Sequence, residues 1–383
     1  AYVYANLLGN EAGRIIYDGG SMIASGGQIV TSGPRFSFHD HQVTSAAVDL
    51  DLNRLSQART VGRDLDPGDQ TIARSDFHWP GEQGPSPIAP PRPWSKEDEF
   101  SHAVALGLFD YLRKSHSHGF VVSLSGGADS AAVACLVHLM RTLAIQDLGE
   151  DAWQQALAHL PAPPSARQLL LCIYQATANS GQVTEHAARE LAAALDADFD
   201  SWDVQAAVDH YRSLSETTIG RKLTWEDDDI ALQNIQARVR APGIWMQANL
   251  RNALLLSTSN RSEAAVGYAT MDGDTCGGLS PIAGIDKAFL RHWLRWLEKK
   301  GSTTVPTIPA LSLVNAQQPT AELRPPEQDQ TDEGDLMPYP ILDAIERHAI
   351  RDKQSPANVL QLLRHQFPDH PPTTVRAWVC LLY

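Results

Sequence analysis

The sequence predicts an α/β protein with a doubly wound parallel sheet, preceded by a separate group of β-strands. From about residue 95 onward, short apolar runs alternate with helix-like segments, as in a parallel sheet whose strands are joined by helices. Within this region the apolar run 120–124 opens into the glycine-rich turn Ser125–Ser130 and then into a helical stretch. Residues 1–59 instead show one short strand pattern after another.

The strands expected in the first 59 residues are short and β-prone. They are 14–17, 21–24, 28–31 and 43–48. The glycine pairs at 19–20 and 26–27 are typical of hairpin turns. A proline-rich stretch follows, and proline removes backbone donors and stiffens the chain. We therefore interpret residues 60–94 as a linker between two domains, 1–59 and 95–383.

The second domain is expected to begin with a helix that Ser95 caps, with Asp98 three positions later. The elements expected after it are strand 120–124, a helix from 131, strand 169–174, helix 185–195, helix 228–249, strand 253–258, helix 286–298 and helix 339–350. Residues 306–330 are polar and interrupted by proline, so we expect either a loop over the site or a mobile segment. In a sheet of this kind, the ligand site lies at the carboxyl ends of the strands.

The composition narrows the class of protein. A net charge of −14 over 383 residues argues against a nucleic-acid or acidic-membrane partner, and no run approaches the roughly 18 apolar residues of a membrane span. The four widely spaced cysteines contain no C-x-x-C pair and are typical of reduced thiols in a cytoplasmic protein. The chain starts without methionine inside a β-like segment and ends in the apolar run 379–383. We therefore expect it to be part of a longer protein.

The turn Ser125–Ser130 has the chemistry of a phosphate-binding loop. Gly126 and Gly127 lack a β-carbon, so the backbone can point successive N–H groups into one concavity at the positive end of the next helix. Asp129 can then hold a magnesium ion on bound phosphates. The Gly-Lys-Ser/Thr ending of a Walker loop is missing, so the turn is not expected to position a γ-phosphate for transfer. It resembles the pyrophosphate loop of N-type ATP pyrophosphatases, which break ATP between the α and β phosphates.

A second cluster follows the strand expected at 253–258. It comprises Thr258–Glu263 and the glycine-rich segment Gly267–Gly278. The Glu263 carboxylate could face Asp129 across the crevice, and two carboxylates with phosphate oxygens would suit magnesium. The alternative is that Glu263 caps the next helix. The glycine-rich segment is either a plain surface loop or a loop whose backbone comes close to a ligand.

Five segments in order resemble the NAD synthetase family. They are Ser125–Ser130, Asn234–Arg240, Thr258–Glu263, Gly273–Pro281 with Lys287 beyond it, and Thr320–Pro325 with Gln330–Glu333. The likeness covers roughly residues 94–350 and implies the adenine nucleotide α-hydrolase-like fold. Residues 1–59 are similar to the last strands of the nitrilase-like glutamine amidohydrolase domain of glutamine-dependent members, which implies a partial nitrilase-like α/β domain.

The resemblance implies an ATP-dependent amide ligase of NAD biosynthesis. The carboxylate of deamido-NAD attacks the α-phosphorus of ATP and expels pyrophosphate; ammonia then attacks the adenylated carbonyl and releases AMP and NAD. The implied partners are therefore deamido-NAD, ATP with Mg²⁺, and ammonia, in a homo-oligomer.

The family motifs assign roles to individual positions. The implied ATP contacts are Ser125, Gly126, Gly127, Ala128, Asp129, Ser130 and Thr258. The implied deamido-NAD contacts are Asn234, Arg238, Glu263, Tyr268 and Asp274. Asp129 and Glu263 become metal ligands, and Lys287 and Asp129 become the catalytic residues, with Lys287 touching phosphate at the reacting centre.

Several alternatives stay open at the level of sequence. Arg238 could be a solvated helix charge, and Lys287, just after a helix-capping Asp286, could be an ordinary surface cation. Cys276 stands where this loop is expected to have serine, and we interpret it as a tolerated change. The glutamate, lysine and cysteine of a nitrilase-type glutaminase are missing, so this chain alone is expected to use ammonia. The rival functions are another N-type synthetase, such as a GMP synthetase-like module, and an inert ATP-binding fragment.

Overall fold

The computed structural model describes residues 2–11, 13–49, 51, 52, 55, 59, 94–160, 165–318, 320, 322–325 and 331–383. The chain divides into two compact units, Ala1–Lys96 and Glu97–Tyr383, and each is described by itself. Most of the expected linker, residues 60–93, lies outside the described residues, as do parts of the expected loop 306–330.

Short antiparallel strands build the first unit. They are β1 (Tyr2–Ala5), β2 (Leu8–Glu11), β3 (Ile15–Asp18), β4 (Ser21–Ser25) and β5 (Gln28–Ser32). Strands β1, β4 and β5 form one sheet in the order β1-β4-β5, and β2 pairs with β3. Gly26 and Gly27, with φ of +59° and +80°, form the expected hairpin between β4 and β5. Both glycines are needed there because this tight turn requires positive φ at its central residues.

Two sequence predictions for this unit are wrong. The glycine pair at 19–20 does not close a hairpin, because β3 pairs with β2 while β4 pairs with β1 and β5. The chain instead crosses there from one sheet to the other. Residues 43–48 form no strand, although their composition is β-prone.

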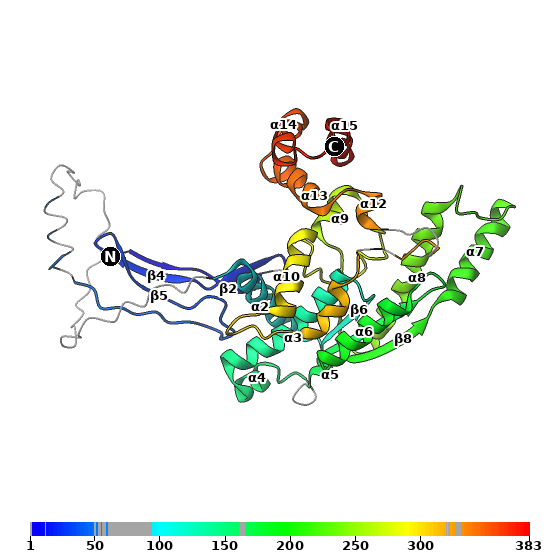
Figure 1. The fold of residues 1–383 in the computed structure, drawn as a ribbon. Helices are drawn as coiled ribbons and strands as arrows, with labels where there is room; N and C mark the ends of the chain where they lie inside the picture. The colour runs from blue at the N-terminus through cyan, green and yellow to red at the C-terminus, as the bar shows by residue number, and fades with distance from the viewer. Residues whose placement is uncertain are drawn as a thin grey trace, which may run out of the picture. The chain divides into compact units, whose positions relative to one another are not determined.

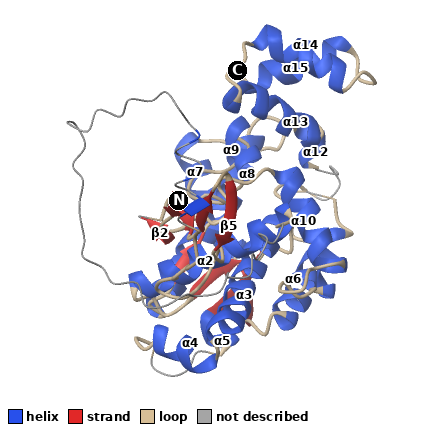
Figure 2. Ribbon diagram, turned by 90° about the vertical axis from the view of Figure 1, so that its left-hand side faces the viewer, coloured by secondary structure: helices blue, strands red, loops and turns tan. Residues whose placement is uncertain are grey.

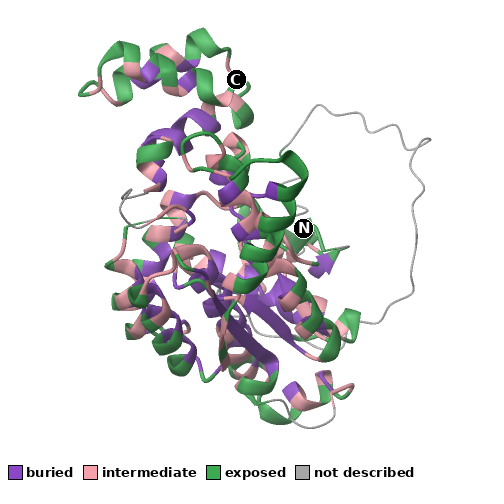
Figure 3. Ribbon diagram, turned by 90° about the vertical axis from the view of Figure 1, so that its right-hand side faces the viewer, coloured by how far each residue is buried: buried purple, intermediate pink, exposed green. Residues whose placement is uncertain are grey.

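The second unit is built on a four-stranded parallel sheet, which confirms the predicted fold class. Its strands are β6 (Phe120–Ser123), β7 (Leu170–Ala176), β8 (Asp198–Asp203) and β9 (Leu254–Leu256), in the order β8-β7-β6-β9. In the central register, Val121 lies opposite Leu171 and Leu255. Helices surround the sheet in Figure 2. Strands β6 and β7 are almost wholly buried at the centre of the unit (Figure 3), whereas β8 at the edge is half-buried to exposed.

Helices connect and cover the strands (Figure 1). They are α2 (Lys96–Ser115), α3 (Ala128–Leu148), α4 (Glu150–Ala156), α5 (Ala166–Leu169), α6 (Gln182–Ala194), α7 (Gln205–Ile219), α8 (Asp229–Leu250), α9 (Arg261–Val266), α10 (Lys287–Lys299), η1 (Pro309–Leu311), α11 (Ser312–Asn315), α12 (Asp332–Asp335), α13 (Tyr339–Glu346), the π-turn η3 (Arg347–Arg351), α14 (Pro356–Gln366) and α15 (Pro372–Leu382). Helix α8 packs on one face of the sheet through Ile244 and Ala248, against Val121 and its neighbours. Alternate residues of β6, Phe120 and Val122, are buried as well, so both faces of the sheet are covered.

Helix α3 is the central helix and carries the site at its N-terminal end. Within the described part of the chain it is the one helix long and apolar enough to cross a membrane, yet 67% of that stretch is buried inside the structure. Its apolar composition is that of a core helix.

The C-terminal helices form a satellite core. Val359 and Leu363 of α14 and Val375 and Val379 of α15 pack with apolar residues of α13, including Ile345. Figure 1 shows α14 and α15 beside each other, beyond the end of α13. The expected helix 339–350 is therefore α13 continued by the short π-helix η3.

Candidate active site

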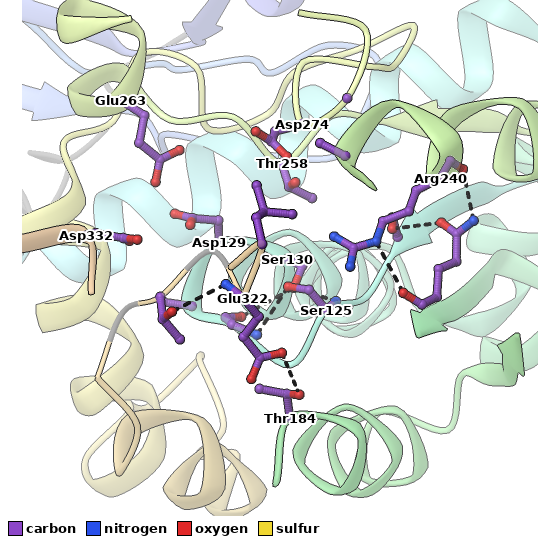
Figure 4. A pocket seen from close by; sticks show the side chains of 18 of the residues that line it. Ser125, Asp129, Ser130, Thr184, Arg240, Thr258, Glu263, Asp274, Glu322 and Asp332 are labelled. Atoms are coloured by element: carbon purple, nitrogen blue, oxygen red, sulfur yellow. Dashed lines mark hydrogen bonds between the residues drawn. The ribbon is translucent and has the colours of Figure 1, made fainter. Parts of the chain in front are cut away.

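A pocket of about 200 Å³ lies at the carboxyl ends of β6, β7 and β9. This is where a ligand site is expected in a doubly wound sheet. In Figure 4, Asp129, Glu263 and Asp332 lie on one side of the pocket and Arg240 on the other. All four residues line it.

The glycine loop has the backbone of an anion site. Gly126 has φ of +81°, and a β-carbon there would lie 2.2 Å from the carbonyl oxygen of Thr184. Only glycine fits at this close approach. Gly127 caps α3 without a side-chain hydrogen bond, which leaves the first N–H groups of the helix for a ligand.

Two serines hold this loop in shape. The Ser130 hydroxyl accepts a hydrogen bond from the Ser125 amide at 3.1 Å and donates to the Gly127 carbonyl at 3.3 Å. The Ser125 hydroxyl accepts from the Gly127 amide at 3.3 Å. Gly126 is the one member of the loop that does not line the pocket, so its role is conformational.

Lys287 connects the loop to the second cluster of sequence motifs. It is the first residue of α10 and only 2% exposed. Its Nζ donates to Asp129 of the loop and to Glu263 of α9, the latter at 2.9 Å. Asn260 caps α9 and donates to the second oxygen of Asp129 at 2.9 Å. The surface-cation alternative for Lys287 is therefore wrong, and so is the capping alternative for Glu263.

The charged groups of this cluster shift one another's pKa. Burial alone would lower the pKa of Lys287, but Asp129 and Glu263 outweigh it and raise that pKa well above its ordinary value. Burial, and then the charge of Asp129, raise the pKa of Glu263 above the usual carboxyl range, against the opposite effect of Lys287. The lysine therefore stays charged between two carboxylates.

A buried network from α13 holds the first turn of α10. The Lys287 amide donates to the Ser262 hydroxyl at 3.0 Å, and this hydroxyl donates to Asp343 at 2.6 Å. The other Asp343 oxygen accepts from the Ala288 amide at 3.1 Å. Asp343 is 4% exposed. It therefore fixes the start of the helix that carries Lys287.

We expect Asp343→Asn to lower the free energy of unfolding by about 1–3 kcal/mol, because the amide nitrogen cannot accept and leaves one buried donor unsatisfied. Urea unfolding of the variant and wild type measures this difference. The exposed Asp369→Asn, also in the C-terminal region, is the control and should stay within about 0.5 kcal/mol. Equal midpoints for wild type and Asp343→Asn would contradict the anchoring role.

The other expected site residues divide into two groups. Thr258, Tyr268 and Asp274 line the pocket with the loop and Lys287. Asn234 and Arg238 do not line it: Asn234 accepts from the Thr270 hydroxyl at 3.0 Å, and Arg238 Nε donates to the Met271 carbonyl at 3.0 Å. These two residues brace the loop that carries Asp274. Their contact with deamido-NAD stays a prediction.

Sequence reasoning missed several residues of the pocket. They are Thr184, Gln175, Arg240, Glu322 and Asp332. Arg240 Nε donates to the Gln175 carbonyl at 3.2 Å, and its two Nη atoms have no hydrogen-bond partner among the described residues. Burial lowers the pKa of Arg240. The sequence did contain a signal for Arg240, because this residue is the last one of the family-like segment that begins at Asn234.

Asp332 is a buried carboxylate of the pocket with one oxygen that has no partner among the described residues. It is 5% exposed; one oxygen accepts from the Tyr339 hydroxyl at 3.0 Å, while Oδ1 has no hydrogen-bond partner within the described ranges. Burial raises its pKa, although the Lys287 charge acts in the opposite direction. A buried acceptor without a donor is costly, so it points to an interaction with a ligand.

The sequence profile of the family described as NAD synthase matches residues 101–378. The chain belongs to the NAD synthase family. It is 30% identical over 370 residues to the human glutamine-dependent NAD(+) synthetase, which covers 88% of this chain and 52% of the relative. The chain thus spans about half the length of the curated relatives it matches.

Solved structures agree with this membership. The crystal structure of a glutamine-dependent NAD(+) synthetase from Cytophaga hutchinsonii superimposes with a TM-score of 0.77 at 39% identity, covering 100% of this chain and 57% of that one. The glutamine-dependent synthetase from Acinetobacter baumannii, solved with ADP, shares the fold with a TM-score of 0.58 at 19% identity, covering 99% of this chain and 56% of that one. The family match extends beyond residues 94–350, where the sequence resemblance was noted, and takes in α14 and most of α15.

Proposed function

We propose that this chain amidates deamido-NAD to NAD, with cleavage of ATP to AMP and pyrophosphate. The observation that carries the proposal is the meeting of the Ser125–Ser130 loop with Lys287, Asp129 and Glu263 in one pocket. A loop of backbone donors at a helix N-terminus binds phosphates, and a buried cation beside it can stabilise charge that develops during displacement. Membership of the NAD synthase family supports the choice of substrates.

In this proposal the loop amides and the hydroxyls of Ser125 and Ser130 hold the phosphates of ATP, together with Thr258, which lines the same pocket. The deamido-NAD carboxylate attacks the α-phosphorus, and the bond from that phosphorus to the bridging oxygen of pyrophosphate breaks. Negative charge accumulates on the pentavalent phosphorus and the leaving group. The Lys287 ammonium, held at the edge of the loop, neutralises part of that charge.

Arg240, Tyr268 and Asp274 would bind and orient deamido-NAD at the reacting centre. The free Nη atoms of Arg240 suit a carboxylate or a phosphate, since a guanidinium can donate two parallel hydrogen bonds. Asp274 accepts a hydrogen bond from the Thr270 amide at 3.0 Å, so its position is fixed. Ammonia then attacks the adenylated carbonyl, AMP leaves, and the amide nitrogen loses a proton.

The residues fit a magnesium ion that ATP brings with it. Within the described residues, no group of three or more His, Cys, Asp or Glu side chains could hold a metal by itself. Asp129 and Glu263 offer two carboxylates, and magnesium commonly binds through one or two carboxylates, substrate phosphates and water. The orphaned Oδ1 of Asp332 adds to the negative character of this side of the pocket. When bound, the ion would neutralise charge on the phosphates.

The nitrogen source is a separate prediction. Ammonium should support NAD formation by this chain and glutamine should not, because none of its four cysteines lies in a glutaminase setting. Two of them, Cys135 and Cys172, are fully buried, and burial raises the pKa of each thiol well above its ordinary value. The measurement is NAD formed from deamido-NAD and ATP with either nitrogen source, at equal concentration. Glutamine-driven synthesis by protein free of contaminating glutaminase would contradict our interpretation of residues 1–59.

The same assay tests the proposed function against its rivals. AMP formation that requires deamido-NAD supports it, AMP formation with XMP in place of deamido-NAD would favour a GMP synthetase-like enzyme, and ATP binding without AMP formation would identify an inert fragment. The cytoplasmic location and the homo-oligomer stay predictions.

A further inference from the structure

Helix α10 presents a row of three cations to the pocket. Lys287, Arg291 and Arg295 follow each other at intervals of four residues, so they share one side of the helix at a rise of about 6 Å per step. All three line the pocket. The row starts at the reacting centre, at Lys287, and continues for two turns along the wall.

The two arginines carry charge that the protein itself does not neutralise closely. The Nη1 of Arg291 lies 3.9 Å from Glu333, and Arg295 makes no ion pair within the described part of the chain. Arg324, by contrast, is tightly paired: it contacts Asp229 at 2.8 Å and Asp335 at 2.9 Å. In a chain with 45 acidic and 31 basic residues, guanidinium groups on a pocket wall without a close acidic partner indicate an anionic ligand.

The wall next to this row supplies neutral polar groups. Residues of α11 and of the segment after it line the same pocket, namely Asn315, Gln317, Gln318 and Thr320. Asn315 already donates to Glu298 at 2.8 Å, which neutralises neither arginine. The combination of a cationic row and amide side chains suits phosphate oxygens.

We propose that Arg291 and Arg295, together with Lys287, form a binding subsite for pyrophosphate. The inference rests on the proposed function, which makes pyrophosphate the leaving group. Lys287 neutralises charge at the bond that breaks, and the two arginines bind the β and γ phosphates of ATP before the reaction and free pyrophosphate after it. Guanidinium groups match phosphate geometry through paired hydrogen bonds.

The test is direct binding of inorganic pyrophosphate to the protein by calorimetry, without ATP or deamido-NAD. Arg295→Gln should weaken binding about 10-fold or more, the scale of a lost charged hydrogen bond, and Arg291→Gln with Arg295→Gln should weaken it further. Lys299→Gln is the matched control, since it removes one positive charge from the same helix at a side chain that is 72% exposed and does not line the pocket. It should change the affinity less than 2-fold.

Unchanged pyrophosphate affinity in the double variant, no binding by the wild type at millimolar pyrophosphate, or equal weakening in Lys299→Gln would each overturn the subsite. Thermal melting checks that the variants fold. The proposed function can fail separately. If the wild-type protein binds pyrophosphate through these arginines but forms no AMP with deamido-NAD, the subsite is supported and the proposed reaction is contradicted. If the wild-type protein makes NAD but the double variant binds pyrophosphate normally, the proposed reaction is supported and the subsite is contradicted.

Discussion

Lys287→Met is expected to lower the rate of adenylate formation by about 10²-fold or more, the scale of losing one group that stabilises developing charge. ATP affinity should fall much less, because the amides of the Ser125–Ser130 loop still hold the phosphates. The structure adds a second effect. Lys287 is 2% exposed between two carboxylates, and removing one partner of such a buried cluster costs up to about 3–5 kcal/mol of stability.

Single-turnover release of pyrophosphate, with ATP and deamido-NAD saturating, measures the chemical step. To separate rate from folding, the double variant Lys287→Met with Glu263→Gln removes one of the two carboxylates that lose their cation. It should regain stability relative to Lys287→Met without regaining rate. A wild-type rate in a folded Lys287→Met protein would remove this lysine from the reaction.

Asp129→Asn is expected to reduce AMP formation by about 10³-fold or more while the fold stays intact. The amide has the shape of the carboxylate but neither its charge nor its second strong acceptor, so the variant loses a ligand for a cation on the phosphates and one partner of Lys287. Asn260 currently donates to Asp129 at 2.9 Å, and this contact survives if the amide oxygen takes that position.

AMP release from ATP, in the presence of deamido-NAD and ammonium, measures the effect of Asp129→Asn. Near-UV circular dichroism checks the fold. Asp151→Asn, an exposed acidic residue at the start of α4, is the control and should behave as wild type. Near-normal AMP release by Asp129→Asn would refute the assignment of the metal and catalytic role.

The sequence predicts those parts of the site whose signals are local. The loop Ser125–Ser130 is a continuous motif at a strand end, and its geometry follows from glycine stereochemistry. The meeting of Asp129, Glu263 and Lys287 follows from topology, since β6 and β9 are neighbours and their carboxyl ends lie at the same edge. Sequence could place these residues at that edge, but it could not show that Lys287 is buried between the two carboxylates.

Other features depend on contacts between distant segments and leave little trace in the sequence. Strand β8, with the sequence Asp-Phe-Asp-Ser-Trp-Asp, pairs only with β7 at the edge of the sheet and lacks the apolar run that identified its neighbours. In the sequence, nothing distinguishes Asp343 from another polar residue of a helix. Only the structure shows that it accepts hydrogen bonds from the Ser262 hydroxyl and the Ala288 amide. The error at the glycine pair 19–20 has a similar cause, because a turn signal does not specify which strands pair across it.

The anchoring of α10 by Asp343 has a consequence for biosynthesis. Ser125–Ser130 leaves the ribosome before α13, and the start of α10 gains its contacts with Asp343 only when α13, more than 50 residues beyond Lys287, has been made and has packed. A nascent chain that ends before α13 therefore has the phosphate loop without a seated lysine. Under the proposed function, catalytic competence therefore requires that α13 has been made and has packed.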